Sequence, residues 1–404
     1  MRRPSRFLLA LVAGLLIAVT GPAAGAPTVN DPVFTQGLQW GLARVGAPDA
    51  WARSTGAGVT IAVIDSGADL GHQDLAGKIV GQVSCIGANG DPTRCTGSAQ
   101  DDNGHGTHVS GIAVATTDNG LGIAGLAPSA KLLAVRVLAN DCDASGCTAS
   151  GTSGDVAAGI RWAVDHGARI VNLSLGGGAI QSALGCSFCD AIDYAWSKGA
   201  IAVIAAGNDS VLPSGFADEP AVIVTATDRD DRRASYSNTS SDVVRAARWP
   251  VAAPGGEAET QDTDCGTGGQ PQGILSTYWQ AGRTNQYACL AGTSMAAPHV
   301  SGALALLLSL GYAPQAAIER LLATTKDLGP PGRDDSFGYG RIDVARAVGP
   351  APAVTPTSQG GGPTVTGGST PPSAGGGPSS SLPGQPTTSV PVAPGSDAPV
   401  ISTP

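Results

Sequence analysis

Four polar residues of this 404-residue chain stand where its predicted elements begin or end. Asp65 closes the apolar run VTIAVID, Asn208 closes AIAVIAAGN, His105 lies in the glycine-flanked segment NGHGTH, and Ser294 opens the small-residue stretch GTSMAAPHV. A carboxylate, an amide, an imidazole and a hydroxyl are together the groups needed for acyl transfer through a serine nucleophile. Their positions make hydrolysis of an acyl bond the first hypothesis.

The four groups have complementary tasks in that chemistry. His105 can take the proton of the Ser294 hydroxyl near neutral pH, and a carboxylate such as Asp65 fixes the imidazole tautomer. At a helix start Ser294 also presents an unpaired backbone N–H, and Asn208 can add a side-chain donor for the oxyanion of the intermediate. We expect Pro298 to lie so close to the helix start that its missing N–H would be unpaired anyway.

Each residue alone also has a simpler explanation. Asp65 can be a turn residue at a strand end, His105 a loop histidine, and Ser294 the N-cap of a buried helix. His105 and His108 can instead be metal ligands, although no further ligand cluster lies near them in the sequence. The catalytic interpretation is favoured because all four side chains needed for acyl transfer occur together, each at the start or end of a predicted strand or helix.

The segments that must position these groups alternate between predicted strands and helices. Helices are predicted from a Ser153 cap to a Gly167 stop and over 189–199. The strands are short runs, apolar almost throughout, as in parallel sheets covered on both faces: 59–65, 130–138, 169–176, 200–208 and 221–228. The predicted fold class is α/β, a three-layer arrangement of a mostly parallel sheet with helices on both faces. Active groups gather at the carboxyl ends of the strands in such sheets.

The chain divides into four predicted regions. Residues 1–26 have the basic start, apolar centre and Ala-Gly-Ala site of a signal peptide, so we expect a secreted, extracellular protein of bacterial type. A short extension, 27–38, precedes a catalytic domain over 39–348. Residues 349–404 are rich in Pro, Gly, Ser and Thr and almost without charge, which predicts a disordered tail. No apolar segment follows, so no membrane anchor is predicted.

The overall charge narrows the possible partners. The net charge is −9 and the sequence pI is about 4.9. Such a surface is unsuited to nucleic acid or anionic lipid and attracts cations. We expect a monomer that binds neither nucleic acid nor a membrane.

Five motifs resemble those of the subtilisin-like serine proteases. AVIDSG, NGHGTHVSG, NLSLGG, AAGN and GTSMAAPHVSG occur in that family's order, within a similarity that runs from about Trp40 to Val348. The serine context differs from the G-x-S-x-G pattern of α/β-hydrolases. The resemblance implies a secreted serine endopeptidase of broad specificity in which Asp65, His105 and Ser294 form the triad. Asn208 would be the amide of the oxyanion hole.

The same resemblance implies where a polypeptide substrate binds. Ser174, Leu175 and Gly176 would form an edge strand that pairs with the extended peptide through main-chain hydrogen bonds, which explains tolerance of sequence. Ala205, Ala206 and Gly207 would form the wall of the pocket for the side chain that precedes the cut. Their small size leaves room for a sizeable apolar group.

A structural calcium ion is expected from the resemblance and from the donors present. Calcium takes six to eight oxygen ligands from carboxylates, amides and carbonyls. The matching ligands would be the side chains of Asp31, Asp74 and Asn119 and the carbonyls of Thr117, Leu121 and Ile123. An ordinary polar loop is the alternative.

Eight cysteines lie in the exported part, where disulfides are expected. Their sequence allows 105 connectivities, and their spacing suggests local pairs in surface loops: Cys85–Cys95, Cys142–Cys147, Cys186–Cys189 and Cys265–Cys289. A four-thiolate zinc site formed by Cys142, Cys147, Cys186 and Cys189 is the rival interpretation.

Two other functions compete with a broad endopeptidase. One is a dedicated processing protease that resembles the mycosins of a specialised secretion system, which have similar short N-terminal extensions and usually a membrane helix. The other is a non-catalytic scaffold on a protease fold. The dozen residues of 27–38 cannot form a folded propeptide, so we expect no activation by removal of one.

Overall fold

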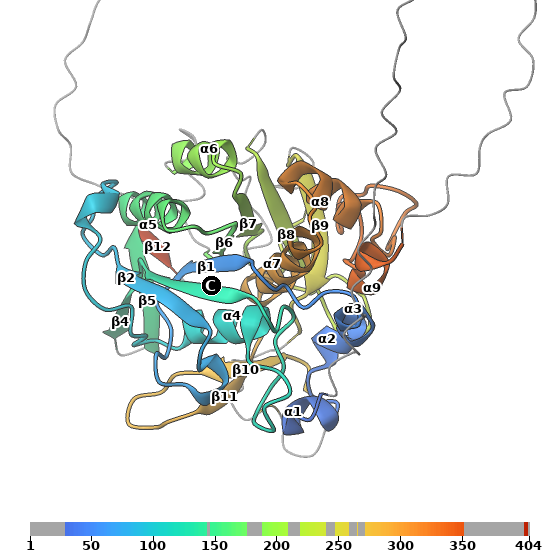
Figure 1. The fold of residues 1–404 in the computed structure, drawn as a ribbon, viewed down its shortest axis with the longest axis horizontal. Helices are drawn as coiled ribbons and strands as arrows, with labels where there is room; N and C mark the ends of the chain where they lie inside the picture. Colours follow the sequence, from blue (N-terminus) through green and yellow to red (C-terminus); the bar gives the residue numbers. More distant parts are fainter. Residues whose placement is uncertain are drawn as a thin grey trace, which may run out of the picture. The chain divides into compact units, whose positions relative to one another are not determined.

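The computed structural model describes residues 29–143, 146–175, 188–208, 219–239, 247–257, 265, 271–350 and 400–402. The described residues up to Gly349, together with Val400–Ser402, belong to one compact unit. All the elements below belong to this unit (Figure 1).

The centre of the unit is a seven-stranded sheet whose neighbouring strands are all parallel. Its spatial order is β2 (Ile79–Ser84), β3 (Lys131–Arg136), β1 (Thr60–Asp65), β6 (Ile170–Leu173), β7 (Ile201–Ala205), β8 (Ala221–Thr227) and β9 (Trp249–Pro254). The five predicted strands are confirmed. The two missed strands lie at the sheet edges: β2 alternates in burial, and β9 contains prolines, which central strands avoid.

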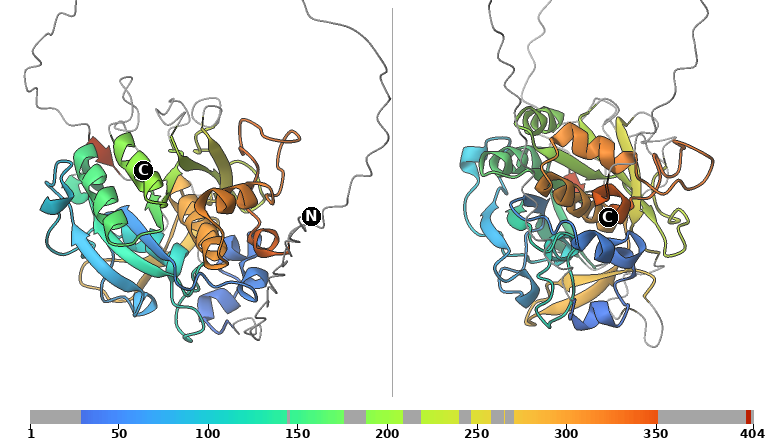
Figure 2. Two further views of the ribbon diagram at one scale, coloured as in Figure 1. Left: turned by 45° about the horizontal axis from the view of Figure 1, so that its top comes forward. Right: turned by 45° about the vertical axis from the view of Figure 1, so that its right-hand side comes forward.

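Helices cover both faces of the sheet, so the three-layer α/β prediction is confirmed (Figures 1 and 2). Along β1, Ile61 and Val63 belong to one core cluster, whereas Ala62 and Ile64 belong to the other. The first cluster includes α4 (His105–Val114) and α7 (Thr293–Ser309), with α2 (Trp40–Arg44), α3 (Ala47–Trp51), α8 (Pro314–Leu322) and α9 (Val344–Val348). The second includes α5 (Ser153–Asp165) and α6 (Cys189–Ser197).

Smaller elements complete the unit. They are α1 (Pro32–Thr35), two 3-10 turns (Gln73–Leu75 and Pro92–Arg94), the antiparallel pair β10 (Ile274–Tyr278) and β11 (Gln286–Leu290), and a three-stranded sheet of β12 (Val400–Ser402), β5 (Gly146–Thr152) and β4 (Ala139–Asp143).

The predicted cap of α5 is off by one residue. Thr152 is the N-cap, because its hydroxyl accepts from Asp155 N, and Ser153 is the first helical residue. Gly167 ends the helix as predicted, with a positive φ of 91° that favours glycine.

Two of the four predicted disulfides are confirmed, Cys85–Cys95 and Cys265–Cys289. The other two pairs include side chains outside those described, although Cys142 and Cys189 are also disulfide-bonded and so offer no thiolate to zinc. The surface placement was wrong: Cys85 is fully buried and Cys289 is 4% exposed. Cys85 packs in the same core cluster as Ile64, whereas its sequence neighbours Ser84 and Ile86 are half-buried and exposed.

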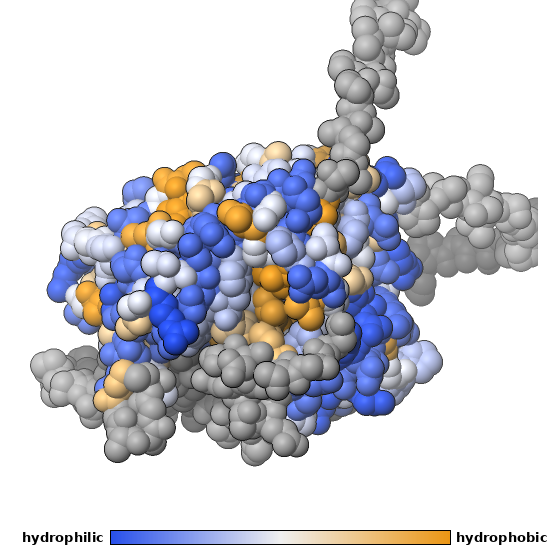
Figure 3. Space-filling model, turned by 90° about the horizontal axis from the view of Figure 1, so that it is seen from below, coloured by the Kyte–Doolittle hydropathy of each residue, from blue (hydrophilic) through white to orange (hydrophobic). Residues whose placement is uncertain are grey.

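The face in Figure 3 is largely hydrophilic, and its hydrophobic side chains form small groups. Within the described part of the chain, no helix is long and apolar enough to cross a membrane.

Candidate active site

Asp65 and His105 meet where β1 ends and α4 begins. Asp65 is the last residue of β1, and His105 is the first residue of α4. The His105 Nδ1 atom lies 2.8 Å from Asp65 Oδ1, and both side chains are buried. A carboxylate only accepts hydrogen bonds, so Nδ1 carries the proton. In the neutral ring Nε2 is then a free base, and no group among the described residues bonds to it.

The environment raises the pKa of His105. Burial by itself lowers the pKa, but the charge and hydrogen bond of Asp65, with the charge of Asp101, outweigh it. The imidazolium is therefore stabilised where it would form, as a general base requires.

Asp101 holds the turn that presents His105, a role that the sequence analysis missed. Its carboxylate accepts from the backbone N–H groups of Asn103, Gly104 and Thr107. It also accepts from the Ser66 hydroxyl, which in turn accepts from Gly106 N. The available signal was an aspartate in the polar turn DDNG, where Asp side chains commonly accept from backbone N–H groups a few residues on.

Ser294 is the second residue of α7 and does not cap it. The N-cap is Gly292, and no side chain caps this end. The hydroxyl of Ser294 donates to Ser174 O at 3.3 Å, and its backbone N–H has no acceptor in the described part of the chain. Helices α4 and α7 pack against each other, which brings the segments of His105 and Ser294 together (Figure 1). The Ser294 hydroxyl is not bonded to His105 in this structure.

Pro298 has a different role from the one predicted. It lies inside α7, where a residue with an N–H would donate to Ser294 O four residues back. Ser174 supplies the missing donor: its hydroxyl donates to Ser294 O at 2.8 Å. Asn172 Nδ2 donates to Ser174 Oγ, and Ser301 Oγ donates to Asn172 Oδ1. Because Pro298 has no N–H, Ser294 O is free to accept from the Ser174 hydroxyl, and this hydrogen bond connects Ser294 to the end of β6.

Asn208 is oriented by the residue before Ser294. Its Oδ1 accepts from both the backbone N–H and the hydroxyl of Thr293, at 3.0 and 2.9 Å. This fixes the amide with Nδ2 on the side of Gly292, whose added Cβ would lie 3.2 Å from it. None of the described residues accepts a hydrogen bond from Nδ2, so Asn208 and the N–H of Ser294 are two donors left for a ligand.

Comparison with known proteins identifies this arrangement. Residues 56–340 match the model of the Subtilase family. The chain belongs to the subtilase family. It is 39% identical over 326 residues to Thermitase of Thermoactinomyces vulgaris, covering 80% of this chain and 99% of the relative. It is 38% identical over 277 residues to Subtilisin Savinase of Lederbergia lenta, covering 67% and 84%.

A solved structure agrees with these matches. A protease from Pseudoalteromonas arctica superimposes with a TM-score of 0.64 at 32% identity, covering 80% of this chain and 98% of that one. This subtilase is therefore a serine endopeptidase by family.

The structure places most of the predicted substrate-binding residues of the subtilase at strand ends. Ser174 and Leu175 follow β6, and the Leu175 side chain is buried in the core, so only backbone is left there for a peptide. Ala205 and Ala206 are 3% and 5% exposed at the end of β7. Gly207 donates its N–H to Thr293 Oγ1. Gly176 lies outside the described residues.

Asn238 supports this strand end and was not predicted. Its backbone N–H donates to Gly207 O, and its Nδ2 donates to Ala206 O. A Cβ on Gly207, whose φ is 99°, would lie 2.5 Å from that amide. The segment RASYSN, which the sequence analysis used only as part of the family likeness, supplies this residue.

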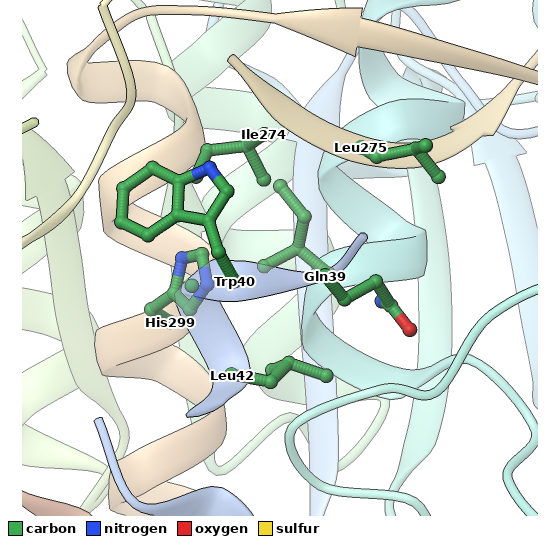
Figure 4. Close-up of a pocket in the computed structure, with 8 residues that line it drawn as sticks. Gln39, Trp40, Leu42, Ile274, Leu275 and His299 are labelled. Atoms are coloured by element: carbon green, nitrogen blue, oxygen red, sulfur yellow. The ribbon is translucent and has the colours of Figure 1, made fainter. Parts of the chain in front are cut away.

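Two further buried histidines, His108 and His299, make structural contacts. Nε2 of His108 lies 3.0 Å from both Ile274 O and Ala288 O, so His108 joins α4 to the β10–β11 pair and forms no metal site with His105. His299 Nδ1 bonds to Met295 O, and its ring lines a cavity of about 10 Å³ with Trp40 (Figure 4). Burial lowers the pKa of His108 to about 3 and that of His299 to about 4.

Three of the predicted calcium ligands, Asp31, Asp74 and Asn119, meet at the loop that contains residues 117–123. Asp31 accepts from the N–H groups of Asp118 and Asn119, and Asn119 Nδ2 donates to Asp74 at 3.1 Å. Ile123 N also donates to Asp74. Both carboxylates are fully buried. Burial, with the charge of Asp74, outweighs the backbone hydrogen bonds and raises the pKa of Asp31.

One neighbour of this loop was not predicted. Tyr287 of β11 donates its hydroxyl to Asp74 Oδ2 at 2.9 Å. A Cβ on Gly122 would collide with both Tyr287 Oη and Asp74 Oδ2. Neither Asp31 nor Asp74 forms an ion pair with a lysine or arginine of the described residues.

Proposed function

We propose that this subtilase hydrolyses polypeptides through an acyl-enzyme on Ser294. His105 is the general base and then the general acid, and Asp65 orients it. The observation that carries the proposal is the buried Asp65–His105 pair with a free Nε2, on a helix packed against the helix of Ser294.

The first step transfers one proton and forms one bond. Rotation of the Ser294 side chain away from Ser174 O directs its hydroxyl to Nε2 of His105, which takes the proton as Oγ attacks the peptide carbonyl. Contacts of this kind are often long in a free enzyme and shorten when substrate binds. His105 then gives the proton to the leaving amine, and a water molecule repeats the sequence on the ester.

The oxyanion of each tetrahedral intermediate needs donors that are already in place. Ser294 N–H and Asn208 Nδ2 are the two that the described structure leaves unpaired. Because the Thr293 contacts hold the Asn208 amide before substrate arrives, little reorganisation is required in the transition state. An extended peptide would pair with the backbone of Ser174, Leu175 and Gly176, which supports broad specificity.

A single experiment separates this function from its rivals. The protein is incubated with denatured casein and with a fluorophosphonate probe, beside the Ser294→Ala variant. We expect general cleavage and labelling, both lost by several orders of magnitude in the variant, which should melt at an unchanged temperature. Labelling without cleavage of casein would indicate a dedicated processing protease. Absence of both would indicate a scaffold and overturn the proposal.

We further propose that Asp31, Asp74 and Asn119, with the carbonyls of Thr117, Leu121 and Ile123, hold a structural calcium ion. The donors suit a hard cation, which would neutralise two buried carboxylates that no described cation pairs with. In Ser294→Ala, chelation should lower the melting temperature by several degrees. The same treatment of an additional Asp31→Asn, Asp74→Asn variant should change little. An unchanged melting temperature in the parent would contradict the site.

Secretion is proposed on the sequence of residues 1–26, which lie outside the described structure. Expression of the full chain in a bacterial host, followed by N-terminal sequencing of protein in the medium, tests it. A start near residue 27 is expected, and retention of Met1 in the cell fraction would contradict it.

A further inference from the structure

The last strand of the chain, β12, pairs with an edge of the small sheet that contains β4 and β5. Val400–Ser402 runs antiparallel to β5, with Ile401 opposite Gly151. The other edge of β5 pairs with β4. Figures 1 and 2 show β12 beside β5 and α5. Val400–Ser402 therefore occupies the edge of β5 opposite β4.

This edge lies close to the catalytic groups. Val137, which leads into β4, donates its N–H to Asp65 O at 2.8 Å. Asn103, two residues before His105, donates its Nδ2 to Asn140 of β4. A Cβ on Gly151 would lie 2.3 Å from Val137 O. The residue of β5 that faces Ile401 is thus packed against the segment bonded to Asp65.

An open strand edge presents unpaired N–H and C=O groups to any extended peptide. A substrate of the proposed function must bind in an extended form beside His105, so it and β12 require the same kind of backbone edge. We infer that Val400–Ser402 is a tethered strand that occupies the β5 edge and competes with extended substrates. This inference rests on the proposed function for its kinetic consequence, but not for the docking itself.

The occupant is the chain's own C-terminus for two reasons. Val400–Ser402 pairs with β5 inside the compact unit. The intervening sequence of about 50 residues has the Pro-, Gly-, Ser- and Thr-rich composition of a linker, and linkers of that length have a root-mean-square reach of roughly 40 Å. A strand tethered in this way is presented at an effective concentration on the order of millimolar.

The composition of the segment also suits this role. Val400 and Ile401 are β-branched and favour strands, while the preceding residues are mostly Pro, Gly, Ser and Thr. The composition of Val400 and Ile401 therefore favours strand pairing, and that of the preceding residues is typical of a linker.

The kinetic test uses two deletions of equal length in the full chain. One removes residues 399–404, and the matched control removes residues 375–380 from the spacer. For a peptide substrate with four or more residues before the cut, the first deletion should lower KM about 4- to 10-fold, as for a competitor that fills the edge 75–90% of the time. The kcat should not change. A single-residue ester, too short to reach β5, should show no difference.

Hydrogen exchange tests the docking without catalysis. In the Ser294→Ala background, backbone amides of residues 148–152 should exchange at least several-fold faster after deletion of 399–404, but not after the control deletion. Added peptide PVISTP at millimolar concentration should restore protection.

The outcomes separate the two ideas. Equal exchange in the two deletion proteins overturns the docking of β12. Changed exchange with an unchanged KM overturns the competition. If neither protein cleaves any peptide while exchange still differs, the proposed function fails and the strand docking stands.

Discussion

The contact between Asp65 and His105 joins residues 40 positions apart. It fixes which imidazole nitrogen carries the proton, and with burial it decides the pKa at which His105 becomes a base. Asp101 and Ser66 hold the turn around this contact. At this scale the chemistry depends on a few hydrogen bonds made by groups that burial keeps from water.

We expect Asp65→Asn to lower kcat/KM by roughly 10⁴-fold, because an amide stabilises neither the required tautomer nor the imidazolium. The acidic limb of the pH profile should also move to lower pH. The neutral ring is the active form, and without the carboxylate the burial of His105 lowers its pKa. The profile of kcat/KM against pH measures both effects. Asp69→Asn, a nearby carboxylate that does not touch His105, is the control, and an unmoved limb in Asp65→Asn would argue against the assignment.

At the scale of elements, α7 and β6 are joined by an interruption in helical hydrogen bonding. Pro298 leaves Ser294 O without its helical donor, and Ser174 provides a replacement from the end of β6. The helix start that carries the nucleophile is thereby attached to the strand end proposed to bind substrate. Both elements are buried around this link.

A double-mutant cycle tests that link. In the Ser294→Ala background, Ser174→Ala should cost about 1–3 kcal/mol of unfolding free energy, since it leaves Ser294 O and Asn172 Nδ2 without partners. Pro298→Ala restores a backbone N–H at position 298. In its presence Ser174→Ala should cost measurably less. Denaturant unfolding gives the four free energies, and additive costs would contradict the coupling.

At the scale of the whole molecule, Asp231 joins segments from both ends of the folded chain. Its carboxylate lies 2.7 Å from Arg341 Nε, 2.6 Å from Lys326 Nζ and 3.7 Å from Arg44 Nη1. The side chains of Asp231 and Arg341 are 7% and 6% exposed. A buried arginine without its partner is costly, so this cluster holds the terminal segments on the sheet.

Asp231→Asn should therefore destabilise the protein by about 3–5 kcal/mol. Asparagine is chosen because residue 231 has a φ of 65°, which asparagine tolerates. Asp230→Asn is the matched control: Asp230 pairs with Arg232 in solvent, 63% and 74% exposed, and should change stability by no more than about 0.5 kcal/mol. Urea unfolding of both variants in the Ser294→Ala background decides, and equal effects would contradict the proposed role.

The buried histidines make stability depend on pH. Burial lowers the pKa of His108 to about 3 and that of His299 to about 4. In the unfolded chain both histidines have an ordinary pKa of about 6.5, so below that pH the unfolded chain binds more protons at these two residues than the folded chain does. The contribution of these two histidines to stability should thus fall as pH decreases from about 6.5 to 4.

His299→Leu should reduce this pH dependence in Ser294→Ala, as measured by unfolding at several pH values. The control His166→Gln changes an exposed histidine and should leave the slope as it is. An identical slope in all three proteins would contradict the explanation.

Much of the fold was predictable because its signals are local. The apolar runs that form β1, β3, β6, β7 and β8 are contiguous in sequence, and so are the glycine that ends α5 and the motifs of the family. Chemistry-bearing residues at the ends of these runs pointed to Asp65, His105, Asn208 and Ser294. Edge strand β9 was missed because its short apolar run, WPVAAP, contains two prolines, which are typical of a loop.

Sequence alone thus determined the class of fold, the family and the residue types available for catalysis, because each is indicated by short contiguous segments of the chain. Only the tertiary structure decided which groups meet. Ser174 donates a hydrogen bond to the Ser294 carbonyl that Pro298 leaves without a helical donor, and Tyr287 donates to Asp74. Asn238 donates to the backbone at the end of β7, and β12 pairs with β5. These partners are far apart in the chain, and a buried polar atom accepts whatever donor packing brings to it, which no local pattern records.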